Sequence, residues 1–136
     1  MNLTPATAYT NDTLTCTVNL TDSTNGSFHL DYVVYKNGAS LATDNYMFYS
    51  NGTSLAIATV TPSQTTKNDI FTCAVRGYDG ARYGAYVNSS NLTILSLPPT
   101  QGTPILNSTN GTSAYSKISN LTAYNQSTQD LDSDKV

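Results

Sequence analysis

Few residues in this chain of 136 are of the types that carry out acid–base, nucleophilic or metal chemistry. His29, the only histidine, alternates with Asp31 along a predicted strand, so the carboxylate could orient the imidazole ring. Any nucleophile would be one of many serines or threonines, and no nucleophile elbow or oxyanion glycine motif accompanies the pair. Chance placement explains the pair better than catalysis, because a triad needs three groups in a defined geometry. Phosphate-binding glycine loops, CxxC and HExxH motifs are also missing, so we expect that the chain is not an enzyme.

A run of carboxylates lies in "DLDSDKV", residues 130–136. Asp130, Asp132 and Asp134 occupy alternate positions, as do the first ligands of a calcium-binding loop. The glycine at the sharp turn of such a loop and its later glutamate are absent. Two interpretations therefore stay open: a calcium site on these three residues, and an acidic turn in water.

The placement of asparagine gives the clearest chemical signal in the sequence. Of the 14 asparagines, 11 begin an N-x-S/T triplet, whereas chance would give only about 4 at this content of serine and threonine. These triplets predict N-linked sugars, which would solubilise a surface that has few charges. A strand composition rich in threonine and asparagine is the competing explanation. The candidate acceptors are Asn2, Asn11, Asn19, Asn25, Asn51, Asn88, Asn91, Asn107, Asn110, Asn120 and Asn125.

The charge content is low, with 11% charged residues and a formal net charge of -3 at pH 7. The few lysines and arginines are scattered, so we expect no nucleic-acid partner. The longest apolar runs fall far short of the roughly 20 residues that cross a bilayer, which predicts no membrane insertion. Met1 is not followed by a signal-peptide pattern, so any targeting segment is expected to be already absent. Together with the sugar acceptors, these features favour an extracellular or cell-surface location.

Period-two alternation runs through the chain, and no long stretch carries a helical apolar stripe, so the predicted fold is nearly all β. In "TLTCTVNL", every second residue is apolar or cysteine. Similar segments are separated by Asn37-Gly38, Asn51-Gly52 and Asp79-Gly80, pairs that are typical of tight turns. The predicted inward positions are Leu14, Cys16, Val18, Leu20, Phe28, Leu30, Tyr32, Val34, Leu55, Ile57, Phe71, Cys73, Val75, Leu92 and Ile94.

About seven short strands joined by turns predict a sandwich of two sheets. Cys16 and Cys73 fall on the inward faces of the second and the penultimate strand, so a disulfide between them would join the sheets through the core. Such a bond would stabilise the fold by roughly 4 kcal/mol through the entropy of the unfolded chain. It would also fit an oxidising compartment. The competing interpretation is two free thiols that pack as small apolar side chains.

Two short motifs resemble the immunoglobulin-type domain. "NDIFTC" is similar to its D-x-Y-x-C pattern, with Asp69 and Cys73 in place and Phe71 where tyrosine usually stands. "YVVYKNG" is similar to its W-Y-K-N-G pattern, with Val34 at the tryptophan position. The resemblance implies an immunoglobulin-like sandwich over residues 1–96 that lacks the tyrosine-corner hydrogen bond and has a small residue at its centre.

A narrower resemblance combines four segments, "TAYTNDTLTC", "YKNGASLATD", "KNDIFTCAVRGYDG" and "YVNSSNLTI". Together they resemble the Ig-like repeats of large archaeal surface glycoproteins over residues 4–95. This resemblance implies a structural, glycosylated repeat of an extracellular surface protein or filament, with no catalysis. The implied partners are adjacent repeats or copies of the chain itself. Some Ig-like repeats of bacteria and archaea also bind calcium between domains at an acidic turn.

The rest of the chain predicts a second, partial repeat. Residues 97–104, "LPPTQGTP", read as an extended, Pro-rich linker. Within residues 105–136, "SAYSKISNLTAYNQST" aligns with "TAYTNDTLTCTVNLTDST", so that Leu121 corresponds to Leu14. The position of the first cysteine holds Ala123, so this repeat would have no bridge.

Two strands do not form a stable sandwich in water, so the partial repeat needs an explanation. Either the chain is a piece of a longer repeat protein, or its last two strands complete a neighbouring molecule by strand addition. Donated strands would make the chain a self-polymerising subunit, since head-to-tail contacts that do not close generate filaments.

Ten tyrosines support an alternative function. Tyr78, Tyr83 and Tyr86 flank the last predicted hairpin, and Tyr46 and Tyr49 lie near another. Loops rich in tyrosine bind sugars or proteins through flat, partly polar surfaces, so the alternative is an adhesin module with a glycan or protein ligand. Tyrosine is also a good strand former, and coverage of the sheet faces is the simpler explanation.

Overall fold

The computed structural model describes residues 1–19, 21, 28–49, 52, 54–78, 80–108 and 121–131. The chain forms two compact units, Met1–Ser96 and Leu97–Val136. In the described residues of the first unit there are nine strands and the three-residue 3-10 helix η1 (Pro62–Gln64). The strands are β1 (Asn2–Thr4), β2 (Ala8–Tyr9), β3 (Leu14–Asn19), β4 (Phe28–Lys36), β5 (Ala39–Tyr49), β6 (Ser54–Val60), β7 (Ile70–Tyr78), β8 (Val87–Asn88) and β9 (Leu92–Leu95).

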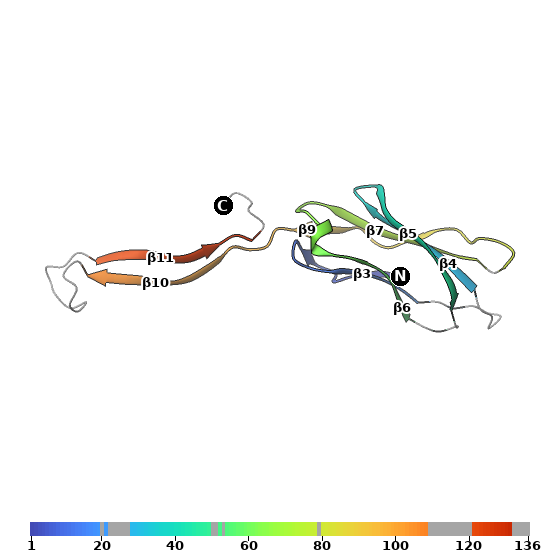
Figure 1. Cartoon of the computed structure of the whole chain (residues 1–136), viewed down its shortest axis with the longest axis horizontal. Coiled ribbons are helices and arrows are strands. Elements are labelled where there is room, and N and C mark those ends of the chain that lie inside the picture. Colours follow the sequence, from blue (N-terminus) through green and yellow to red (C-terminus); the bar gives the residue numbers. More distant parts are fainter. Residues whose placement is uncertain are drawn as a thin grey trace. The chain divides into compact units, whose positions relative to one another are not determined.

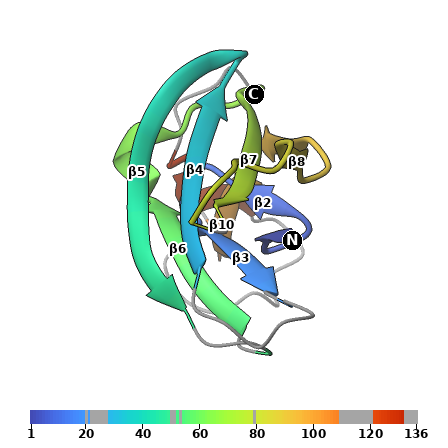
Figure 2. The ribbon, with the colours of Figure 1, turned by 90° about the vertical axis from the view of Figure 1, so that its right-hand side faces the viewer.

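The first unit is an all-β sandwich of two packed sheets (Figure 1). One sheet has the order β1-β3-β6, and the other has the order β2-β9-β7-β4-β5, with β8 also paired to β7. All pairs are antiparallel except β2 with β9. Figure 2 shows β4 beside β5 in one curved layer and β3 beside β6 in the other. No helix in the described part of the chain is long and apolar enough to cross a membrane.

The alternating pattern of the sequence is confirmed by the core of the sandwich. Both sheets contribute every second side chain, and Phe71, at 0% exposure, is the largest of the fully buried ones. Tyr32 and Leu55 are only half-buried and pack against the core. Leu20 lies outside the described residues. The buried apolar cluster comprises Ala8, Leu14, Cys16, Val18, Leu30, Val34, Ile57, Val60, Phe71, Cys73, Val75, Leu92 and Ile94.

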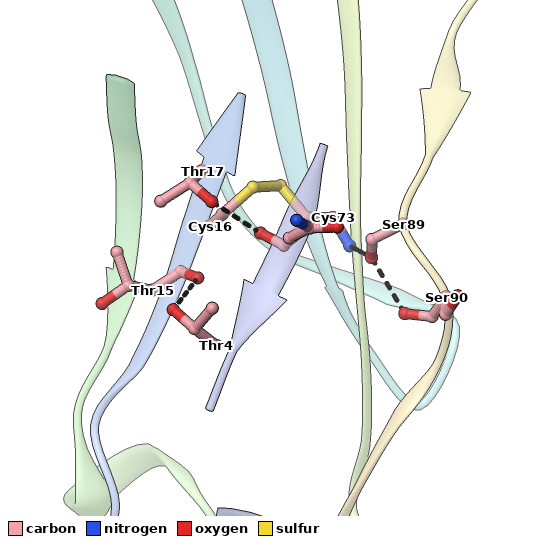
Figure 3. Close-up of a disulfide and its surroundings, with 8 residues drawn as sticks. Thr4, Thr15, Cys16, Thr17, Cys73, Ser89 and Ser90 are labelled. Carbon is pink, nitrogen blue, oxygen red and sulfur yellow. Dashed lines mark hydrogen bonds between the residues drawn. A yellow bond between two sulfur atoms is a disulfide. The ribbon is translucent and has the colours of Figure 1, made fainter. Parts of the chain in front are cut away.

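A disulfide joins the two sheets through this core (Figure 3). Cys16 on β3 and Cys73 on β7 have Cα atoms 6.4 Å apart and are 57 positions apart in the sequence. Both residues are almost fully buried. The backbone amide of Cys73 donates to Ser89 Oγ at 3.0 Å, so the side chain of Ser89, which lies between β8 and β9, pairs with this amide. Because both cysteines are buried, the disulfide is shielded from water.

The corner before β7 is held by the carboxylate of Asp69. Asp69 is buried, and its oxygens accept hydrogen bonds from Asn37 Nδ2 at 2.8 Å and from the Thr66 amide at 2.6 Å. Lys36 Nζ forms an ion pair with the same carboxylate at 2.9 Å. The Phe71 ring, two residues later, is fully buried in the core and takes no part in these hydrogen bonds.

Asn37 connects this corner to the hairpin between β4 and β5. Asn37 and Gly38 have φ angles of 52° and 81°, as a two-residue turn of this hand requires. The Asn37 side chain also accepts a hydrogen bond from the Ile70 amide at 2.8 Å. One residue therefore forms the turn and fixes the start of β7.

The second unit contains an antiparallel pair, β10 (Thr100–Ser108) and β11 (Leu121–Gln129). The predicted linker 97–104 is too long, because β10 already begins at Thr100. Pro104 lies between Gly102 and Ile105, where the register shifts. A proline is tolerated at such an irregularity because it has no amide hydrogen to pair.

Candidate functional site

A ladder of polar pairs crosses the outer face of the larger sheet from β4 to β7. The register sets Asp31 directly opposite Arg76, and His29 directly opposite Tyr78. Directly opposed side chains of an antiparallel pair lie on the same face and interact. The His29 and Tyr78 rings meet edge to face, with their centroids 5.8 Å apart.

Asp31 binds Arg76 firmly. The Arg76 Nε and Nη2 atoms lie 3.0 and 2.9 Å from Asp31 Oδ2, and Asp31 is only 7% exposed. Hydrogen bonding to Asp31 raises the pKa of Arg76, against an opposing effect of burial. The carboxylate that the sequence placed beside His29 therefore serves to fix a guanidinium.

Arg76 in turn contacts two tyrosines of the segment after β7. Its guanidinium carbon lies 4.0 Å from the centre of the Tyr83 ring and 4.8 Å from that of Tyr86. Tyr83 also stacks on Tyr78 at 4.6 Å between centroids and bridges to it through the backbone. We call Asp31, Arg76, Tyr78, Tyr83 and Tyr86 the arginine–tyrosine cluster.

The cluster borders a cleft of about 440 Å³. Its apolar lining includes Val18, Leu30 and Val75, which belong to the end of the core. Arg76 and Arg82 add positive charge, and the described lining contains no carboxylate. A cleft of this size with an apolar base and a few polar groups can hold a small ligand or one sugar residue.

Sequence reasoning identified the tyrosines of this cluster but missed its centre. Tyr78, Tyr83 and Tyr86 come together as the hairpin prediction suggested, while the side chains of Tyr46 and Tyr49 are outside the described part. Arg76 was missed because its role depends on the register between β4 and β7. The available signal was an outward arginine and an outward aspartate in a chain that has few charges.

The candidate sugar acceptors in the described residues are all exposed: Asn2, Asn11, Asn19, Asn88, Asn91, Asn107 and Asn125. At Asn91 the side-chain oxygen accepts a hydrogen bond from Thr72 at 2.7 Å. At Asn125 the side-chain nitrogen donates to Thr128. The acceptors outside the described residues are Asn25, Asn51, Asn110 and Asn120.

The proposed calcium ligands are described only in part. Asp130 follows β11, whereas Asp132 and Asp134 lie outside the described residues. Among the residues that are described, no group of three or more His, Cys, Asp or Glu side chains could hold a metal ion.

The second unit has an antiparallel pair that can be compared with β1 and β3 of the first. In the first unit, β1 pairs with β3 so that Leu3 is opposite Cys16 and Thr4 is opposite Thr15. In the second unit, Leu106 is opposite Ala123 and Asn107 is opposite Thr122. Ala123, which the sequence alignment matches to the position of Cys16, therefore also stands opposite a leucine.

The repeated pair exposes apolar side chains that its counterpart in the first unit covers. Ile105, Leu106 and Tyr124 are 50%, 58% and 50% exposed, whereas Leu3 of β1 packs against the core. Large exposed apolar side chains close together on one element mark an interaction surface. The faces of the β10–β11 pair are therefore the second candidate site.

No protein-family model matches this chain, and the searches of curated proteins and solved structures found nothing similar to it.

Proposed function

We propose that the chain is a structural, glycosylated repeat of an extracellular surface protein or filament, and that it assembles with other copies of itself through its second unit. The observation that carries this proposal is the β10–β11 pair, which exposes Leu106 on one face and Ile105 and Tyr124 on the other. Two strands with an uncovered apolar face gain stability when another molecule supplies the missing layer.

The immunoglobulin-like character of the repeat is supported by its pairing. One sheet places β3 beside β6, and the other places β7 between β4 and β9. The disulfide links β3 to β7 across the layers. This combination supports an immunoglobulin-type sandwich with a bridge between its sheets.

An exterior location is supported by two independent features. The disulfide is buried between the sheets, and bonds of this kind persist in oxidising compartments. All of the described sugar acceptors are exposed, as attachment requires. Glycans there would replace the charges that the surface lacks.

Sedimentation velocity of the full chain tests the assembly. The wild type should form oligomers that grow with protein concentration, and Leu106→Asp should shift this growth to about tenfold higher concentration or more, because a charge on the apolar face opposes its burial. Leu95→Asp is the matched control, since Leu95 is an exposed leucine of the first unit. Wild-type protein that stays monomeric at every concentration, or Leu106→Asp protein that assembles equally well, would contradict the proposal.

The arginine–tyrosine cluster supports a second candidate function, the recognition of a sugar or protein ligand. Tyr83 and Tyr86 cover the Arg76 guanidinium and are substantially exposed. Tyr78 stacks on Tyr83 and lines the cleft. Rigid aromatic rings with polar tips suit such ligands.

A glycan array probed with the full chain tests this function. Saturable binding should be lost in Tyr83→Ala, which removes the ring that stacks on Arg76 and Tyr78. Tyr124→Ala, a similarly exposed tyrosine of the second unit, should bind as the wild type does. Binding that is insensitive to Tyr83→Ala would exclude the cluster as the site.

A further inference from the structure

The sandwich has four sheet edges, and they differ in length. β1 and β6 are the outer strands of the smaller sheet, and β2 and β5 are the outer strands of the larger one. β1 has three residues and β2 has two, too few for extended pairing. β5 and β6, with 11 and seven residues, are the edges that can accept another strand.

The two long edge strands, β5 and β6, differ in charge. An exposed charge is a common device that keeps edge strands from pairing with other molecules, and β5 carries the exposed Asp44. β6, "SLAIATV", has no charged residue and no proline. Its composition is rich in strand formers and lacks both protective features.

The strands of the second unit also differ as donors. β11 has no charged residue and no proline. β10 is interrupted at Pro104 by a shift of register. In the first unit, the strand that corresponds to β11 is β3, and β3 pairs with β1 on one side and with β6 on the other. β11 pairs with β10 alone among the described strands, so its other side has no strand partner among them.

We infer that the free edge of β6 accepts the free edge of β11 from another copy of this chain, so that the smaller sheet continues from one molecule into the next. The inference rests on the proposed function and names the acceptor surface. About half of the backbone amides of β6 point away from β3 and are available for the new ladder. The pairing is head to tail and does not close on itself, so it propagates.

When β6 and β11 pair, side chains of similar polarity fall on the same face of the joined sheet. Inward positions of β6, such as Ile57, would continue into the positions of Leu106 and Ala123. On the outward side, Ala56 and Thr59 are exposed, and Asn107 follows Leu106 and so lies on the opposite face of β10. Sugars on Asn2, Asn19 and Asn107 would therefore lie on the face opposite Leu106 and Ala123, whereas Asn125 shares the face of Ala123 and carries no sugar in this pairing.

A lysine on the acceptor edge tests the inference in the full chain. Ala56→Lys places a charge at an exposed position of β6 and should raise the concentration needed for assembly by about tenfold or more. Ala42→Lys is the matched control, an exposed alanine on β5, and should assemble as the wild type does. A synthetic peptide of residues 121–129 should bind the wild type and inhibit its assembly, whereas a scrambled peptide should not.

The outcomes separate this inference from the proposed function. If Ala56→Lys assembles normally and the peptide has no effect while Leu106→Asp still blocks assembly, the acceptor is not β6 and the proposed function stands. If Leu106→Asp also assembles normally, the proposed function fails. Protection of β6 that is complete in a dilute monomer would mean that the chain closes on itself, and would overturn pairing between copies.

Discussion

Asp69 shows how one buried carboxylate can hold a corner of the fold. Its carboxylate contacts Lys36, Asn37 and the Thr66 amide at the corner before β7. Burial alone would raise the pKa of this carboxyl, but the hydrogen bonds and the lysine charge outweigh burial and hold the pKa below its ordinary value of 3.8. A lowered pKa in the folded state means that the ionised form stabilises the fold.

The lowered pKa of Asp69 determines how its contribution to the free energy of unfolding depends on pH. The contribution of Asp69 is fully present above the pKa of the unfolded chain, near 3.8, and is lost as the pH falls through the lower pKa of the folded state. Asp69→Asn should lower the free energy of unfolding at pH 7 by about 1–3 kcal/mol and flatten its decline below about pH 4. Urea unfolding between pH 2 and 7 measures both effects. Asp44→Asn, at an exposed position, is the control, and an equal effect in both variants would contradict this role for the corner.

Individual residues also mark the limit of what the sequence predicts. Alternation alone identified the buried cysteines and most of the core, because a period of two assigns each side chain to a face. It did not identify the roles of Asp31 or Arg76, since these depend on which residues of β4 and β7 stand opposite each other. That register is a long-range property, set by turns and packing.

The disulfide and the apolar core hold the two sheets of the first unit together. β3 and β7 belong to different sheets, and the disulfide is their covalent link. Val34 is buried opposite Cys73, and the half-buried Tyr32 and Leu41 pack beside the core. Because a small residue stands opposite Cys73, we expect the sandwich to depend strongly on the bridge.

Removal of the bridge tests this dependence. Cys16→Ala combined with Cys73→Ala should lower the free energy of unfolding by about 4 kcal/mol, since the loop that the bond closes is no longer constrained in the unfolded chain. This loss is a large part of the roughly 5–15 kcal/mol expected for a domain of this size. Guanidinium unfolding gives the value directly. A loss below about 1 kcal/mol would show that the apolar packing suffices without the bond.

The two strands predicted for the second unit are present, but β10 begins earlier in the chain than the predicted linker suggested. The sequence alignment predicted two strands and a cysteine position filled by Ala123, and β10 and β11 are those two strands. The Pro-rich composition of residues 97–104 suggested an extended linker. β10 begins inside it, at Thr100, and its register shifts on both sides of Gly102.

In the assembled form that we propose, the first unit is a sandwich whose sheets are joined by a disulfide, and the second unit is a strand pair that binds another copy of the chain. The first unit has a buried core and its own disulfide. The second unit exposes Ile105, Leu106 and Tyr124, and two isolated strands are marginal in water. Assembly would therefore stabilise mainly the second unit, and the first would serve as acceptor and spacer.

Native-state hydrogen exchange of the wild-type chain at increasing protein concentration tests this account most directly. Amides in the core strands β3 and β7 should be protected at every concentration, because these strands belong to the sandwich that the disulfide joins. Amides of β11 should exchange rapidly in dilute solution and become protected, by tenfold or more, as the concentration rises. Protection of β11 that does not change with concentration would contradict the claim that another copy completes the second unit.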